Sequence, residues 1–264
     1  MYIPGGACPV SAFLDRLRGT DPVLMIAIRS SRTADVIRIA KSTGHHAVMI
    51  DLEHSTMTLD VAAGLCATAA DLGLFPFVRV REREYGALGP LLDGGARGII
   101  APRVESAAEA IAVARACRFA PRGQRSQLAS APQFGQRPTP AATLNPALDD
   151  ATIVQILIET PAGVARAGEI AAVPGVDLLA FGANDFTAEL GAPGQYADPR
   201  VADAVAVLAA AARQHGKLLM VGGIADPALL GEFDALGACP LRLTGTDTDM
   251  LYAGAAARAE RFLR

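Results

Sequence analysis

The sequence predicts an α/β protein built as a single (β/α)8 TIM barrel, in which eight parallel strands alternate with helices. Three observations support this fold: the apolar runs, the helical stretches between them and the length of 264 residues. Eight short runs rich in Val, Ile and Leu begin near Val23, Ala47, Phe75, Gly98, Ile153, Asp177, Lys217 and Leu241. Uninterrupted apolar runs of this kind are typical of parallel strands buried on both faces.

Helical spacing of apolar residues separates the predicted strands, for example at residues 59–72, 106–117 and 200–214. Ser106 followed by Glu109 predicts a capped helix start, because each side chain accepts a backbone amide of the other residue. We also expect a helical segment before the first strand and a helix after the last. One domain is expected over residues 1–264, with a long loop at about residues 121–150, where Pro, Gln, Ser and Gly are frequent.

A doubly wound open sheet is the structural alternative, because it also alternates strands with helices. The GxGxxG fingerprint that often follows the first strand of such a sheet does not follow the run at Val23. Alternation repeated eight times in one chain of this size therefore favours the closed barrel.

Composition excludes several classes of protein. Hydrophobic residues make up 51% of the chain and charged residues 19%, which excludes a disordered protein. No apolar run reaches the length of a membrane span, and a net charge of −3 gives no basic surface for nucleic acid or for a membrane. The N-terminus lacks the pattern of a signal peptide, so we expect a cytoplasmic protein. Four cysteines without a CxxC pair are expected to be ordinary buried thiols: Cys8, Cys66, Cys117 and Cys239.

Polar residues gather where the predicted strands end, and the active site of a (β/α)8 barrel lies at the carboxyl ends of its strands. These residues are Asp51, Glu53, His54, Arg79, Arg103, Glu159, Asp185 and Asp247. Carboxylates that converge on one rim repel each other unless a cation joins them. Oxygen ligands with few histidines and no paired thiols suit Mg²⁺ or Mn²⁺ better than zinc.

Each of these residues also has a purely structural interpretation. A carboxylate at a strand end can cap a helix or join a salt bridge, and Asp185 fits the first role. Glu159 is harder to explain in this way, because it ends an almost wholly apolar strand, where charge is costly without a partner. His54 follows Asp51 by three residues, and a nearby carboxylate is the usual means of orienting a histidine that acts as a general base.

Five segments of the chain carry a resemblance to a known family. They are IDLEHSTMTLD, PFVRV, GARGIIAPRVESAAEA, ILIETPAGVARAGEIAAVPGVDLLAFGANDFTAELG and TGTDTDML. In order and spacing they resemble the metal-dependent pyruvate aldolases of the HpcH/HpaI family. The resemblance runs from about residue 11 to about residue 255, and the long segment that begins with ILIET is its most specific part.

The resemblance implies a role for most of the strand-end residues. Glu159 and Asp185 match the two metal-binding carboxylates of the family. His54 matches its catalytic base, with Asp51 as the partner of that histidine. Arg79 matches the arginine that contacts the keto or enolate oxygen of the substrate.

The same resemblance implies a substrate-binding turn and one altered loop. The backbone amides of Gly182, Ala183 and Asn184 match the cradle for the pyruvate carboxylate, and free amides at a helix start bind anions. Arg125 keeps its place in a substrate loop whose usual glycines are absent here, so it is a candidate substrate-binding residue. Where some members have Gln two residues before the metal-binding Glu, this chain has Leu157. These departures put the identity of the aldehyde in question more than the chemistry.

A carbon–carbon lyase follows from the resemblance: a class II pyruvate aldolase of the 4-hydroxy-2-oxo acid type, acting on a small 2-oxo acid and an aldehyde. Mg²⁺, Mn²⁺ or Co²⁺ is the implied cofactor. A Schiff-base mechanism is disfavoured, because the two lysines, Lys41 and Lys217, both precede strands. A β-hydroxyacyl-CoA lyase, an oxaloacetate decarboxylase and a non-catalytic relative that binds 2-oxo acids remain as alternatives.

The C-terminal stretch predicts an assembly. Residues 250–263 place small and apolar residues at helical spacing, and exposed apolar patches often mark interfaces. The resembled family commonly forms hexamers through terminal helices. We therefore expect a homo-oligomer, a hexamer, with this helix in an interface. The alternative is that the helix closes the bottom of its own barrel.

Overall fold

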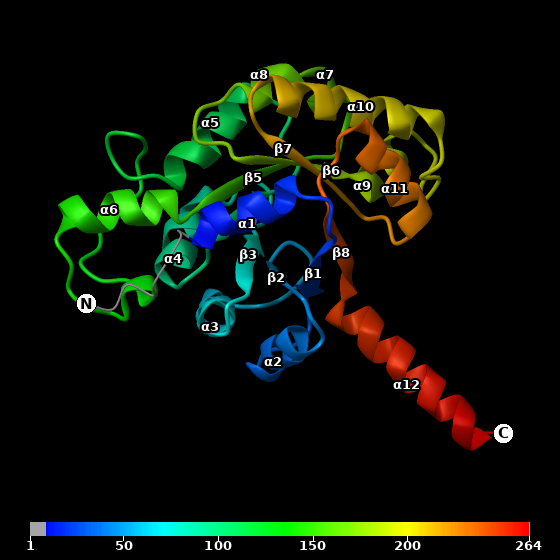
Figure 1. Ribbon diagram of the computed structural model, residues 1–264, viewed down its shortest axis with the longest axis horizontal. Coiled ribbons are helices and arrows are strands. Elements are labelled where there is room, and N and C mark those ends of the chain that lie inside the picture. The colour runs from blue at the N-terminus through cyan, green and yellow to red at the C-terminus, as the bar shows by residue number, and fades with distance from the viewer. Residues whose placement is uncertain (1–8, 264) are drawn as a thin grey trace.

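In the computed structural model, which describes residues 9–263, eight parallel strands curve into a nearly closed barrel with helices around it (Figure 1). Neighbouring strands follow the order β7-β6-β5-β4-β3-β2-β1-β8. Their bounds are β1 Val23–Ile28, β2 Ala47–Asp51, β3 Phe75–Arg79, β4 Gly98–Ala101, β5 Ile153–Ile158, β6 Leu178–Gly182, β7 Leu218–Gly222 and β8 Leu241–Thr246. The predicted barrel is confirmed, with every strand near its predicted position.

The helices connect successive strands and flank the barrel. Their bounds are α1 Pro9–Arg18, α2 Asp35–Ser42, α3 Leu59–Asp71, α4 Leu88–Asp93, α5 Ala107–Ala116, α6 Ala141–Asp150, α7 Pro161–Ala165, α8 Ala167–Ala171, α9 Ala183–Glu189, α10 Pro199–Gln214, α11 Pro227–Leu236 and α12 Asp247–Leu263. Two 3-10 turns, Tyr85–Ala87 and Pro132–Phe134, lie in the connections. The predicted cap of α5 at Ser106 is confirmed, because the amide of Glu109 donates to Ser106 Oγ. The Glu109 carboxylate accepts the amide of Glu105 and the Ser106 hydroxyl in place of the predicted Ser106 amide.

Two apolar layers hold the barrel together, because successive side chains of a strand point to opposite faces. Met25 belongs to the inner cluster that fills the barrel, whereas the next residue, Ile26, belongs to the outer cluster between strands and helices. At the N-terminal end of the barrel, Phe13 of α1 stacks on Phe75 with ring centroids 4.3 Å apart. Helix α1 therefore plugs this end and leaves the opposite end for the site.

A backbone hydrogen bond joins the two sides of the seam between β7 and β8 near the start of β8. The amide of Cys239 donates a hydrogen bond of 2.7 Å to the carbonyl oxygen of Leu219. Beyond β8, helix α12 extends away from the barrel (Figure 1), and Asp247 is its one buried residue within the described chain. The helix does not close the bottom of its own barrel, so that alternative is wrong.

The predicted long loop at residues 121–150 is shorter than expected. Residues 141–150 form α6, and the buried side chains of Leu144 and Leu148 pack in one cluster with Phe119 and Ala131. Leucines four residues apart lie on one face of a helix. Prolines and polar residues surround these leucines, and their frequency favours a loop over a helix in a prediction from sequence.

Three of the four cysteines are buried free thiols, as predicted: Cys66, Cys117 and Cys239. Burial raises the pKa of the Cys239 thiol to about 11, so this group is a neutral packing element. Cys8 lies outside the described residues. No helix within residues 9–263 is long and apolar enough to cross a membrane.

Candidate active site

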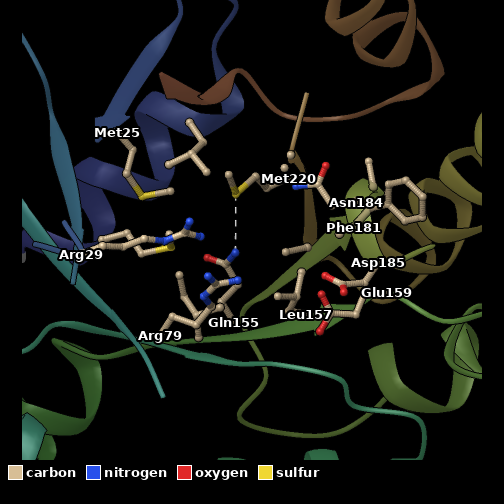
Figure 2. Close-up of a pocket in the computed structure, with 18 residues that line it drawn as sticks. Met25, Arg29, Arg79, Gln155, Leu157, Glu159, Phe181, Asn184, Asp185 and Met220 are labelled. Carbon is tan, nitrogen blue, oxygen red and sulfur yellow. Dashed lines mark hydrogen bonds between the residues drawn. The ribbon is translucent and has the colours of Figure 1, made fainter. Parts of the chain in front are cut away.

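The carboxyl ends of the strands surround a small pocket of about 90 Å³. Figure 2 shows the guanidinium groups of Arg29 and Arg79 on one side of this pocket and the carboxylates of Glu159 and Asp185 on the other. Apolar side chains also line the pocket, among them Met25, Leu157 and Met220. The buried Gln155 donates a hydrogen bond to the Met220 sulfur. The predicted convergence of strand-end residues is therefore observed for these two acids and Arg79.

On the side of the pocket that carries the two arginines, Asp51 is the carboxylate that both guanidinium groups contact. Register pairs Asp51 of β2 directly with Arg79 of β3. The Arg79 guanidinium donates to both Asp51 oxygens, at 3.0 and 2.6 Å, and Arg29 Nε donates to Oδ2 at 2.7 Å. Burial alone would raise the pKa of Asp51, but the hydrogen bonds and charges of Arg79 and Arg29 outweigh it and hold the pKa below its ordinary value. Asp51 is therefore a fixed anion.

His54 is not oriented by Asp51 through its imidazole, which differs from the predicted pair. Only the backbone amide of His54 reaches Asp51, at 3.3 Å from Oδ1. The imidazole Nε2 instead lies 3.9 Å from Glu53 Oε2, and the same Glu53 oxygen lies 3.0 Å from Arg79. The physical reason is that two guanidinium groups already occupy the Asp51 carboxylate. Glu53, noted in the sequence only as a strand-end acid, is the carboxylate that faces His54.

Glu159 and Asp185 form the acidic side. Glu159 is buried at the end of β5, and its Oε1 accepts the backbone amide of Arg103 at 2.8 Å. Arg103 adopts a φ of +52°, an uncommon conformation for a residue other than glycine, and this conformation aims its amide at Glu159. Burial, followed by the charges of Asp185 and Glu53, raises the pKa of Glu159 to about 8. The charge of Arg79 and the Arg103 amide oppose this rise in pKa but do not outweigh burial and the neighbouring carboxylates.

A glycine makes room for the Glu159 carboxylate. A Cβ atom at Gly182 would lie 2.6 Å from Glu159 Oε2 and 2.8 Å from Glu159 Cβ. Such contacts are closer than van der Waals packing permits, so only glycine at position 182 leaves the carboxylate where it is. This cradle lies beside Asp185, which follows in the first turn of α9.

This donor set fits a hard divalent cation. Carboxylate oxygens are the ligands that Mg²⁺ and Mn²⁺ prefer, and a raised pKa indicates acidic oxygens without a compensating charge. No group of three or more His, Cys, Asp and Glu side chains is arranged as a metal site within residues 9–263. Glu159 and Asp185 are the two carboxylates that line this side of the pocket.

The turn between β6 and α9 lines the pocket as predicted. Gly182, Ala183 and Asn184 all contribute to its wall. The Asn184 side chain accepts a hydrogen bond of 2.5 Å from the Tyr196 hydroxyl, which fixes this side chain at the edge of the pocket. Tyr196 follows α9 in an irregular segment, and no feature of the sequence pointed to it.

Arg125 lies away from the pocket, so its prediction as a substrate-binding residue is corrected. Its side chain is buried, its Nη2 donates to Asp93 Oδ1 at 2.7 Å, and its guanidinium lies 4.5 Å from the centre of the Phe119 ring. A carboxylate and an aromatic face within reach hold the guanidinium there. Arg125 is therefore a structural residue of the connection after α5.

Two further strand-end residues, Asp247 and Arg29, lie at the junction between the loop after β1 and the start of α12. Asp247 accepts the backbone amides of Arg29, Ser30 and Ser31, which ties the loop after β1 to the start of α12. Arg29 is not among the predicted site residues, yet it directly follows β1, so the strand-end rule that points to Arg79 also points to Arg29. Neither Lys41 nor Lys217 lines the pocket.

Comparison with known proteins agrees with this geometry. The model of the HpcH/HpaI aldolase/citrate lyase family matches residues 28–239. A 4-hydroxy-4-methyl-2-oxoglutarate aldolase of Hapsidospora irregularis is 37% identical over 79% of this chain and 78% of its own. A hydroxypyruvate/pyruvate aldolase of Pseudomonas aeruginosa is 30% identical over 96% of this chain and 93% of its own.

The solved structures include an HpcH/HpaI aldolase from Desulfitobacterium hafniense DCB-2 with a TM-score of 0.87 and 25% identity, which covers 97% of both chains. The match of the family model spans most of the barrel. It includes the four charged residues that line the pocket, Arg29, Arg79, Glu159 and Asp185. The chain therefore belongs to the HpcH/HpaI aldolase/citrate lyase family.

Proposed function

We propose that the protein is a divalent-metal-dependent aldolase that makes or breaks the carbon–carbon bond between pyruvate and a second carbonyl compound. One observation carries the proposal: an acidic pair, in which burial and repulsion raise the pKa of Glu159, faces an arginine cluster held by Asp51 across one small pocket. A 2-oxo acid needs both features, because its reaction develops negative charge on the keto oxygen.

Glu159 and Asp185 would hold the metal ion. When bound, the ion withdraws electron density from the keto group of pyruvate and so acidifies the methyl group. The two carboxylates follow the adjacent strands β5 and β6, and the Arg103 amide and the space left at Gly182 fix that of Glu159. Assays with added Mg²⁺, Mn²⁺ or Co²⁺ would identify which ion supports the reaction.

Arg79 would stabilise the oxygen on which charge develops. Its guanidinium is fixed by Asp51 on one edge and by Glu53 on another, so little reorganisation is needed during the reaction. The family resemblance assigns the substrate carboxylate to the backbone amides of residues 182–184. This placement would set the keto group between Arg79 and the acidic pair.

His54 would move the proton of the aldol hydroxyl. In the cleavage direction the bond between C3 and C4 breaks and its electron pair passes to the pyruvate half as an enolate. The C4 hydroxyl gives its proton to His54 as the new carbonyl group forms. The imidazole is more than half exposed and lies near Glu53, so it can accept this proton from a bound substrate.

A screen of carbonyl compounds with pyruvate tests the proposed function. The protein is first treated with a chelator and then assayed with and without added Mg²⁺, Mn²⁺ or Co²⁺, with products identified by mass spectrometry. Adduct formation that requires the metal supports the proposal. Full activity in metal-free protein contradicts it, as does cleavage of a β-hydroxyacyl-CoA ester in place of a hydroxy-oxo acid.

We also propose that the chain assembles as a homo-oligomer, a hexamer, with α12 in an interface. Apolar side chains of α12 are strongly exposed in the single chain, including Leu251, Tyr252 and Phe262. Light scattering tests the assembly, since a mass near 27.3 kDa at micromolar concentration would contradict it. Truncation before Met250 tests the helix, because a truncated chain that stays fully assembled places the contact elsewhere. A cytoplasmic location stays a prediction from the sequence.

A further inference from the structure

The loop after β1, residues 29–34, is attached to the first residue of α12. The Asp247 carboxylate accepts three successive backbone amides, those of Arg29 at 2.9 Å, Ser30 at 3.1 Å and Ser31 at 2.6 Å. Burial would raise the pKa of Asp247, but these hydrogen bonds outweigh it and hold the pKa below its ordinary value. Asp247 is therefore a buried anion held among the amides of one short loop.

A β-bulge in β8 brings the first residue of α12 to this loop. The pairing of β1 with β8 passes from Met25–Leu243 to Ala27–Thr246, so β8 has one residue more than β1 over this stretch. Gly245 lies in that stretch with a φ of +135°, a conformation that residues other than glycine rarely adopt. A bulge changes the direction in which the following side chains point. The sequence TGTD at the end of β8 therefore aims its carboxylate at the loop after β1.

The anchored loop carries Arg29 to the active-site pocket. Figure 2 shows the Arg29 guanidinium on the same side of the pocket as that of Arg79. Its Nε donates to Asp51 Oδ2 at 2.7 Å. Within residues 9–263, Nε is the one guanidinium nitrogen of Arg29 that donates to a protein acceptor. Both terminal nitrogens are therefore available to a substrate in the pocket.

Other contacts also fix the loop, but they are more open to water. Ser30 Oγ lies 2.9 Å from Thr248 Oγ1, and Arg32 Nη1 donates to the Arg29 carbonyl oxygen at 2.8 Å. Both contacts are exposed, whereas the contacts of Asp247 with the loop are partly buried, so water competes least with Asp247. A charge that is held in place before the reaction needs little reorganisation during it. Without this anchor, a loop of mostly exposed residues would not hold the guanidinium at the pocket.

We propose that Asp247 is a positioning residue of the reaction and that it acts through Arg29. The inference rests on the proposed aldolase function, to which it adds Arg29 as a second cation beside Arg79 at the oxygen where negative charge develops. Asp247 does not line the pocket, so it does not contact the substrate itself. It holds the backbone that carries Arg29.

The test combines Asp247→Asn and Arg29→Gln in the full chain. Each reaction contains pyruvate in D₂O with Mg²⁺, Mn²⁺ or Co²⁺, and mass spectrometry measures the deuterium that enters the pyruvate methyl group. Each single variant should lower kcat/KM for this exchange by about tenfold, as for the loss of one hydrogen bond to a charged group. The double variant should fall no further than Arg29→Gln alone, because residues that act as one unit are not additive.

Asp249→Asn is the matched control. Asp249 Oδ2 caps the same helix by accepting the Thr246 amide at 3.0 Å, and within the described chain its hydrogen bonds do not reach the loop after β1. This variant should keep the wild-type rate. Amide hydrogen exchange supplies a readout besides activity: exchange in residues 29–31 should be about tenfold faster in Asp247→Asn and unchanged in Asp249→Asn and Arg29→Gln.

The outcomes separate the positioning role from the proposed function. Losses that multiply in the double variant would overturn the positioning role, because the two residues would then act independently. Unchanged amide exchange in Asp247→Asn would also overturn it, as would a wild-type rate in Arg29→Gln, whether or not Asp247→Asn folds. A wild-type protein that exchanges no pyruvate protons with any of the three ions would contradict the proposed function itself.

Discussion

The two sides of the pocket handle buried charge in opposite ways. On the side of β1–β3, Asp51 is wholly buried but receives three hydrogen bonds from Arg29 and Arg79, and its pKa lies below the ordinary value. On the side of β5 and β6, Glu159 is also buried, but its one hydrogen bond among the described residues comes from a backbone amide, and its pKa rises to about 8.

The difference shows where the protein itself supplies compensating positive charge and where a bound ion would supply it. Burial is costly for any carboxylate, and nearby positive charges and hydrogen bonds compensate for that cost. The arginines complete the first side within the protein. The second side is incomplete in charge, which is the physical reason to place the divalent ion there and the oxyanion beside Arg79.

The largest expected effect comes from Glu159→Gln, which removes one of the two carboxylates on the incomplete side. Aldol activity should fall by about a thousandfold or more, because the several kcal/mol of charge stabilisation from the metal would be lost. The metal-dependent rate with pyruvate is the measurement. Glu169→Gln, on the exposed face of α8, is the matched control and should keep full activity. Comparable rates in both variants would refute the assignment.

His54→Ala should remove most C–C cleavage, by about a hundredfold, because the aldol hydroxyl loses its base. Exchange of the pyruvate methyl protons with D₂O should fall much less, since that step does not use the aldol hydroxyl. Arg79→Ala should lose both reactions, because the enolate oxygen loses its cation. Proton NMR in D₂O follows the exchange. Equal and small effects of the two substitutions on both assays would rule out this division of roles.

Gly182→Ala should weaken metal binding by about tenfold, because the added Cβ would lie 2.6 Å from Glu159 Oε2 and displace the carboxylate. Gly168→Ala is the control, since a Cβ at that glycine of α8 meets nothing within 4 Å. Calorimetric titration with Mn²⁺ measures both affinities. If both variants bind Mn²⁺ as the wild-type protein does, the space at Gly182 has no part in the metal site.

The smallest expected effect is the release of a proton when the metal binds. The pKa of Glu159 is raised from 4.5 to about 8, so at pH 7 the metal-free side chain is mostly protonated and must lose that proton to bind an ion. Titrations at pH 7 in two buffers of different ionisation enthalpy should show close to one proton released per ion. Release that is absent at pH 7 would mean that Glu159 is already ionised.

The raised pKa of Glu159 also determines the direction in which the stability of the metal-free protein changes with pH. The folded protein holds the Glu159 proton more tightly than the unfolded chain does, so the metal-free protein should lose stability from this group as the pH rises from about 4.5 to about 8. The fall should be smaller in Glu159→Gln, which carries no titrating group at this position. Thermal unfolding of both proteins with chelator present measures the difference.

The sequence by itself determined the barrel and the rim of the site. Apolar runs and helical spacing are local patterns, and a residue that ends a parallel strand must lie at the carboxyl edge of the sheet. This logic placed Asp51, Arg79, Glu159 and Asp185 correctly. The same logic applies to Arg29, which follows the first strand.

Only the tertiary structure decided which of these groups are partners. The pairing of Asp51 with Arg79 depends on the register between β2 and β3, and it leaves the His54 imidazole near Glu53. The place of Arg125 in the chain predicts a contact with the substrate, yet Asp93, 32 residues earlier, holds its side chain away from the pocket. Charge partners are chosen by distance in space, and the sequence does not specify the distances between residues brought together by long-range packing.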